Sequence, residues 1–178
     1  MILVVGGEKI GLVGYITEET PDLSSTGNVV FNDIESSVEA AVADLEGQGV
    51  DKIIALSHAG FLKDQEVAAA VDGLDVIVGG HSHTLLSNTA EGAAGPYPGV
   101  VQSPDGNPVL VVQDGAWGMY LGDLNVTFDA AGVPVAWDGD PVLLDSSVVQ
   151  DATLLAEAES MNAPMAELQQ QVIGVADT

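Results

Sequence analysis

The fold is decided by residues 75–84, which read DVIVGGHSHT. The apolar run 76–78 predicts a short buried strand, and the glycine pair after it predicts a tight turn that carries His81 and His83. A similar pattern lies upstream, where the short run 52–56 is followed by Ser57 and His58. Imidazole is the commonest metal ligand in proteins, so histidines at the ends of two buried strands predict a metal site.

Helical patterns separate these two strands and precede them. Asn32 and Glu35 have the spacing of a capping box, and apolar residues then recur at helical spacing as far as Gly47. Asp64 is expected to cap a second helix that ends near Val71. Alternating strands and helices predict an α/β fold with parallel strands joined by right-handed crossovers, which places both histidine turns at the carboxyl edge of the sheet.

Both flanks of this region predict further strands. Residues 2–5 and 9–16 are expected to form a hairpin around a glycine turn, and a loop should follow over residues 17–32. Downstream, a long surface loop is predicted over 87–108 and a helix from Asp151, with an interruption near Pro164 and a second short helical run ending at Gly174. The intervening segments predict antiparallel strands that close a sheet, namely 109–113, 120–128 and 133–137.

Composition restricts the possible partners. The 178 residues include 27 acidic residues, three lysines and no arginine, with a formal net charge of −24. This acidic protein is not expected to bind a nucleic acid polymer or an anionic membrane, because both are polyanionic. The chain has no cysteine, no apolar run of membrane-spanning length and no signal peptide pattern.

The histidines leave several interpretations open. In a tight turn, His81 and His83 can diverge far enough to bind two different metal ions, and neutral imidazole suits Zn, Mn, Fe or Ni. Ser57 and Ser82 could instead pair with the histidines as nucleophile and base, although the setting of a nucleophile elbow is lacking. In the simplest interpretation, each histidine is an ordinary hydrogen-bonded residue.

Two motifs resemble a known family. LSHAG at residues 56–60, followed by residues 75–84, resembles the paired signature of the 5′-nucleotidase branch of the calcineurin-like metallophosphoesterases. KIGLVG at 9–14 and QDGAWGMYLG at 113–122 extend the match, which covers about residues 1–145. Residues 172–174 resemble the strand that enters the family's second domain.

The resemblance implies a mixed-sheet, four-layer αββα sandwich and a dinuclear centre. Two divalent ions such as Zn or Mn are implied, with His58 and His81 sharing one ion and His83 binding the other. The implied activity is hydrolysis of phosphate esters, chiefly 5′-nucleotides or 2′,3′-cyclic nucleotides, in nucleotide catabolism. The family also implies an extracytoplasmic location.

The family's Asp-Xaa-His, Gly-Asp-Xaa-Xaa-Asp and Gly-Asn-His-Glu motifs do not occur in this sequence. We therefore expect a fragment, with residues 1–145 as the carboxy-terminal half of a metallophosphoesterase domain and 146–178 as a helical linker toward a second domain. We assign no catalytic or cofactor-binding residues, and we expect the isolated chain to be inactive. The alternatives are a non-catalytic module that binds metal or self-associates through an open sheet edge, and a structural fragment with idle histidines.

Overall fold

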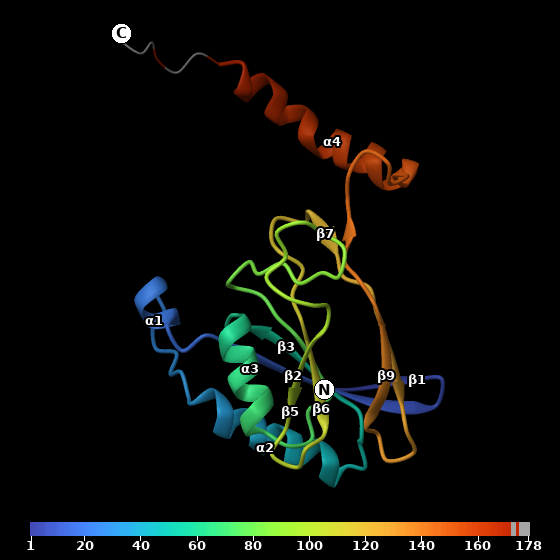
Figure 1. Cartoon of the computed structure of the whole chain (residues 1–178). Coiled ribbons are helices and arrows are strands. Elements are labelled where there is room, and N and C mark those ends of the chain that lie inside the picture. Colours follow the sequence, from blue (N-terminus) through green and yellow to red (C-terminus); the bar gives the residue numbers. More distant parts are fainter. Residues whose placement is uncertain (172–173, 175–178) are drawn as a thin grey trace. The chain divides into compact units, whose positions relative to one another are not determined.

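A computed structural model describes residues 1–171 and 174 of the chain. These residues fall into two compact units, Met1–Leu143 and Leu144–Thr178. The first unit is built on a six-stranded mixed sheet in the order β1-β2-β3-β4-β6-β5 (Figure 1). The predicted α/β class is confirmed.

The sheet opens with the predicted hairpin. β1 (Ile2–Val5) and β2 (Glu8–Ile16) pair antiparallel, with Ile2 opposite Gly11. The turn needs glycine, because φ is +62° at Gly6 and +96° at Gly7. β2 then pairs in parallel with β3 (Ile53–His58), and β3 pairs in parallel with β4 (Val76–Val78), as the crossover pattern predicted.

The segment after the glycine-rich stretch differs from the prediction. β6 (Pro108–Val112) lies parallel to one neighbour, β4, and antiparallel only to the other, β5. β5 (Gly99–Gln102) lies within the segment predicted to be a loop. Residues 109–112 are all buried. Such a continuous apolar run suits a strand covered on both faces, which explains its inner position in the sheet.

Helices α2 (Ile34–Gly47) and α3 (Phe61–Ala70) cover one face of the sheet (Figure 1). A further short helix, α1 (Thr20–Leu23), lies within the segment predicted to be a loop. The cap of α2 is Asp33 rather than Asn32, because the Asp33 carboxylate accepts a 2.8 Å hydrogen bond from the Ser36 N–H. The predicted cap of α3 is also wrong: Gly60 takes that position, and Asp64 is buried inside the first turn.

The core lies between these helices and the sheet. It is formed by aliphatic side chains that alternate along the strands and recur along the helices: Val38, Val42, Leu45, Ile53, Ala55, Val67, Ile77, Val109 and Val111. The opposite face of the sheet is less well covered, since Leu56 is 51% exposed, Val78 38% and Val100 48%. The unit therefore has one sealed face and one partly open apolar face.

A second hairpin packs near part of the open face. β8 (Leu124–Phe128) and β9 (Pro134–Gly139) pair antiparallel as predicted. Side chains of β8 and of the sheet, including Val126 and Val76, line a cavity of about 530 Å³. β7 (Tyr120–Leu121) and β10 (Val142–Leu143) form a separate short pair.

The second unit contains α4 (Ala152–Gln169). This helix continues through Pro164, so the predicted interruption there is wrong. A proline removes one backbone donor without removing those of the neighbouring turns. The predicted short run ending at Gly174 extends outside the described residues. Within residues 1–171 and 174, no helix combines the length and apolarity needed to cross a membrane.

Candidate functional site

His58 and His81 come together at the carboxyl edge of the sheet. His58 is the last residue of β3, and His81 lies in the turn after β4, the next strand in the sheet. The centroids of the two imidazole rings are 5.2 Å apart, and the ring planes make an angle of 67°. Parallel pairing of β3 and β4 brings these residues to the same edge.

His83 lies in a different environment from His81. Its ring centroid is 5.3 Å from the ring centroid of Trp117, which is 87% exposed. His81 and His83 both have positive φ angles, +74° and +55°. Two such residues flanking Ser82 change the chain direction sharply, so the side chains contact different neighbours.

The glycine pair of the turn is required by close packing. A Cβ on Gly79 would lie 2.3 Å from the Asp64 Oδ2 atom, and a Cβ on Gly80 would lie 3.0 Å from the His58 Nδ1 atom. Only a residue without a side chain lets the backbone approach that closely. The turn that carries His81 is therefore seated directly against the end of β3.

Asp64 stabilises the end of β3 that carries His58. Its buried carboxylate accepts a 2.8 Å hydrogen bond from the Tyr15 hydroxyl at Oδ1, and the same oxygen accepts one from Ser57. Burial raises the pKa of Asp64, and burial together with the nearby Asp64 raises the pKa of Tyr15. The Oδ2 atom has no hydrogen-bond partner in the described part of the chain. Sequence reasoning missed this role, because an aspartate near the start of a helix also looks like a cap.

The serine hydroxyls of the two motifs are engaged with groups other than the histidines. Ser57 donates to Asp64, and Ser82 donates to the Gln113 Oε1 atom at 2.9 Å. A nucleophilic serine needs its hydroxyl directed at a general base. The observed partners therefore do not favour the serine nucleophile interpretation.

The side chains at this edge of the sheet are of types that bind metals, but too few of them come together to complete a site. The nearest carboxylate to His81 is that of exposed Glu19, with 3.9 Å between the His81 Nε2 and Glu19 Oε2 atoms. Among the residues that the structure describes, no group of three or more His, Cys, Asp or Glu side chains is arranged to hold a metal ion. Imidazole suits Zn or Mn, but a zinc site normally takes at least three protein ligands.

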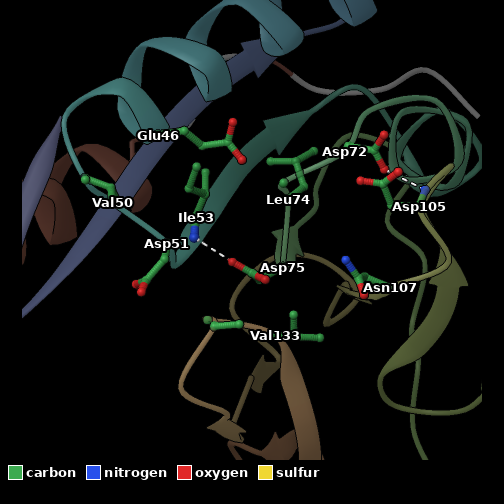
Figure 2. Close-up of a pocket in the computed structure, with 14 residues that line it drawn as sticks. Glu46, Val50, Asp51, Ile53, Asp72, Leu74, Asp75, Asp105, Asn107 and Val133 are labelled. Carbon is green, nitrogen blue, oxygen red and sulfur yellow. Dashed lines mark hydrogen bonds between the residues drawn. The ribbon is translucent and has the colours of Figure 1, made fainter.

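A separate pocket of about 430 Å³ lies at the opposite end of the strands (Figure 2). Five carboxylate residues contribute to its lining: Glu46, Asp51, Asp72, Asp75 and Asp105. Asp75 is almost fully buried and accepts a 2.7 Å hydrogen bond from the Ile53 N–H (Figure 2). Burial raises the pKa of Asp75 to about 7. Sequence reasoning did not identify this pocket, whose lining residues are scattered along the chain.

Comparison with known proteins identifies relatives over nearly the whole chain, although no family model matches. The sequence is 46% identical to a 5′-nucleotidase of Diplobatis ommata over 97% of this chain and 31% of that protein. It is 42% identical to a 5′-nucleotidase of Homo sapiens over the same shares.

Solved structures agree with the sequence relatives. The structure of a 5′-nucleotidase precursor from Thermus thermophilus matches with a TM-score of 0.90 and 42% identity, covering 98% of this chain and 35% of that one. An NAD nucleotidase from Haemophilus influenzae matches with a TM-score of 0.87 and 28% identity, covering 100% and 39%.

The chain spans about a third of the length of these relatives. The match covers nearly all of this chain. The resemblance predicted from the motifs is confirmed, and this chain is related to a segment of the 5′-nucleotidases.

Proposed function

We propose that this chain is the metal-binding, carboxy-terminal half of a metallophosphoesterase domain, and that the whole domain hydrolyses phosphate esters, chiefly 5′-nucleotides or 2′,3′-cyclic nucleotides. One observation carries the proposal: the His58 and His81 rings meet 5.2 Å apart at neighbouring strand ends. The chain in which they meet aligns over 97% of its length with 5′-nucleotidases.

In this proposal, His58 and His81 would hold one divalent ion, Zn or Mn, and His83 would hold a second. Bound divalent ions would neutralise charge on the phosphoryl oxygens of the substrate. The chain itself contributes the imidazoles and the packing that orients them. Gly80 seats the turn against His58, and Asp64 holds Ser57, the residue before His58.

The remaining ligands would come from a complementary part of a longer protein. The described residues offer no third donor of the usual types at either ion. The open apolar face of the sheet, with Leu56 and Val78 exposed, would be covered by the second sheet of a four-layer sandwich. Residues 146–178 would form the helical linker to a further domain. Venom 5′-nucleotidases are among the relatives, which supports an extracytoplasmic location.

Isothermal titration with Mn²⁺ and Zn²⁺ tests the metal assignment, with hydrolysis of a generic phosphate ester measured in parallel. We expect weak binding that His58→Ala and His81→Ala reduce, and no hydrolysis. Asp105→Asn is the matched control, because it removes an exposed carboxylate far from the histidines and reports the non-specific attraction of an acidic chain. Unchanged affinity in both histidine variants would contradict the assignment. Turnover that His81→Ala abolishes would contradict the expected inactivity.

A non-catalytic metal-binding or self-association module is the second candidate. The sheet ends in two edge strands, β1 and β5, and β1 exposes Leu3, Val4 and Val5. An unpaired apolar edge can add a strand from another copy. Sedimentation equilibrium showing a defined oligomer, together with tight binding of one ion per chain and no hydrolysis, would favour this candidate over the enzyme segment.

A further inference from the structure

The structure assigns Gln113 as the positioning residue for the turn that carries His81 and His83. Gln113 follows β6, at the same edge of the sheet as the histidines, and its side chain is 1% exposed. A buried primary amide must find partners for its oxygen and its nitrogen. Among the residues that the structure describes, all the hydrogen-bond partners of the Gln113 side chain lie in residues 80–84.

The Gln113 amide contacts both ends of this turn. Its Nε2 donates a 2.9 Å hydrogen bond to the Gly80 carbonyl, before His81. Its Oε1 accepts a 2.5 Å hydrogen bond from the Thr84 N–H, after His83. Because these partners are a backbone acceptor and a backbone donor, they also determine which amide atom is oxygen and which is nitrogen. One side chain thus bridges the whole segment that carries the histidines.

The conformation that Gln113 bridges is an unfavourable one. His81 and His83 have left-handed φ angles of +74° and +55°, which residues with a Cβ avoid. Such conformations persist where surrounding contacts hold them. The Gln113 bonds on both sides of the pair are contacts of that kind.

Ser82 connects the turn that carries His81 to the chain segment that follows His58. Its hydroxyl donates to the Gln113 Oε1 atom at 2.9 Å and accepts a 3.0 Å hydrogen bond from the Phe61 N–H, at the start of α3. Phe61 lies three residues after His58, so the relay ties the His81 turn to the segment that leaves β3. The 5.2 Å ring separation of His58 and His81 is therefore set through Gln113 and Ser82.

Neither leucine nor ionised glutamate could replace the glutamine here. A leucine of similar size would offer neither donor nor acceptor, and an ionised glutamate could not donate to the Gly80 carbonyl. The functional meaning of the inference rests on the proposed metal-binding role of the histidines. The geometry itself can be tested without metal, so a failure of metal binding and a failure of positioning are separate results.

The experiment measures nuclear Overhauser contacts between ring protons in the metal-free full chain, where three histidines and two tryptophans make assignment direct. Wild type should show a His58–His81 contact and a His83–Trp117 contact. Gln113→Leu should lose both while circular dichroism shows a folded chain. Val111→Ala is the matched control, because it weakens a buried position in β6, the strand just before Gln113, without touching the turn, and it should keep both contacts.

Wild-type contacts in folded Gln113→Leu would overturn the inference. If Gln113→Leu does not fold, Ser82→Ala decides the question. It breaks the link between Gln113 and Phe61 at a solvent-exposed residue and leaves the hydrogen bonds of Gln113 to Gly80 and Thr84 in place. Loss of the His58–His81 contact in Ser82→Ala supports the inference, and an unchanged contact overturns it.

Discussion

Replacing Asp75 with asparagine should stabilise the protein at neutral pH. Asp75 is 7% exposed, and its carboxylate accepts a hydrogen bond from the Ile53 N–H. Burial raises its pKa from an ordinary value of 3.8 to about 7. Keeping the ionised form buried at pH 8 therefore costs about 4 kcal/mol. Asparagine keeps the acceptor for Ile53 and removes the charge.

The sign of the pH dependence follows from the raised pKa. The folded state retains a proton on Asp75 that the unfolded chain releases above its ordinary pKa of 3.8. The contribution of this group to stability is therefore greatest below about pH 4 and falls until about pH 7. Neighbouring Asp51 and Glu46 favour the protonated form, and Lys52 opposes them. Asp72 and Asp105 line the same pocket.

The net gain in Asp75→Asn should be smaller than the full electrostatic cost. The new amide N–H₂ has no assigned acceptor, and an unsatisfied buried donor costs roughly 1–3 kcal/mol. We therefore expect the free energy of unfolding to rise by about 2 kcal/mol at pH 8. The gain should reach zero between about pH 5 and pH 6 and become a loss of about 2 kcal/mol as the pH falls toward 4, because the cost of the unsatisfied amide donor does not depend on pH.

Urea unfolding followed by circular dichroism, at intervals from pH 4 to pH 8, measures this gain. Asp105→Asn is the matched control, because it removes the same charge from an exposed residue lining the same pocket, and it should change stability little at any pH. A difference between Asp75→Asn and wild type that stays constant across the pH range would refute the reasoning, since burial would then not act through ionisation.

Three further substitutions test the packing of the site by urea unfolding and sedimentation. Asp64→Ala should lower the free energy of unfolding by about 2–4 kcal/mol, because it leaves two partly buried hydroxyls, including that of Ser57, without an acceptor. A loss below about 0.5 kcal/mol would contradict this hydrogen-bond network. Gly79→Ala should lower the free energy of unfolding by more than about 2 kcal/mol, because the added Cβ would lie 2.3 Å from the Asp64 Oδ2 atom. Gly47→Ala is its control and should be neutral or stabilising, because an added Cβ there meets no atom within 4 Å. Equal changes in the free energy of unfolding for the two variants would contradict the close contact between Gly79 and Asp64. If the chain self-associates through the sheet edge, as the second candidate requires, Val4→Lys on β1 should reduce that association in sedimentation velocity, and unchanged association would argue against this edge as the contact.

Local patterns predicted the elements that depend on neighbouring residues. The glycine turn at Gly6 and Gly7, the apolar period of α2 and the runs that became β3 and β4 all agree with the structure. Errors arose where two nearby residues competed for one role. Asn32 and Asp33 can both cap a helix, and only the backbone geometry at the first turn selects Asp33.

The strand order beyond β4 depended on long-range contacts. Residues 109–112 read equally well as an antiparallel or a parallel strand, because an apolar run carries no information about its neighbours. β6 takes its inner place because β5 returns from the preceding segment to cover its far edge. No local signal marks that return among the glycines and prolines of residues 87–108.

By itself, the sequence determined the α/β class, the two strand ends that carry His58 and His81, and the relationship to 5′-nucleotidases, because periodicity and motif spacing are properties of short segments. Only the tertiary structure decided what holds those histidines. Asp64 contacts Tyr15, and Gln113 contacts the turn at residues 80–84, across long stretches of the chain. Both side chains support the turn only because the fold buries them beside these partners. The value of a polar side chain depends on its partners and on the exclusion of water, and both are settled only when the sheet has formed.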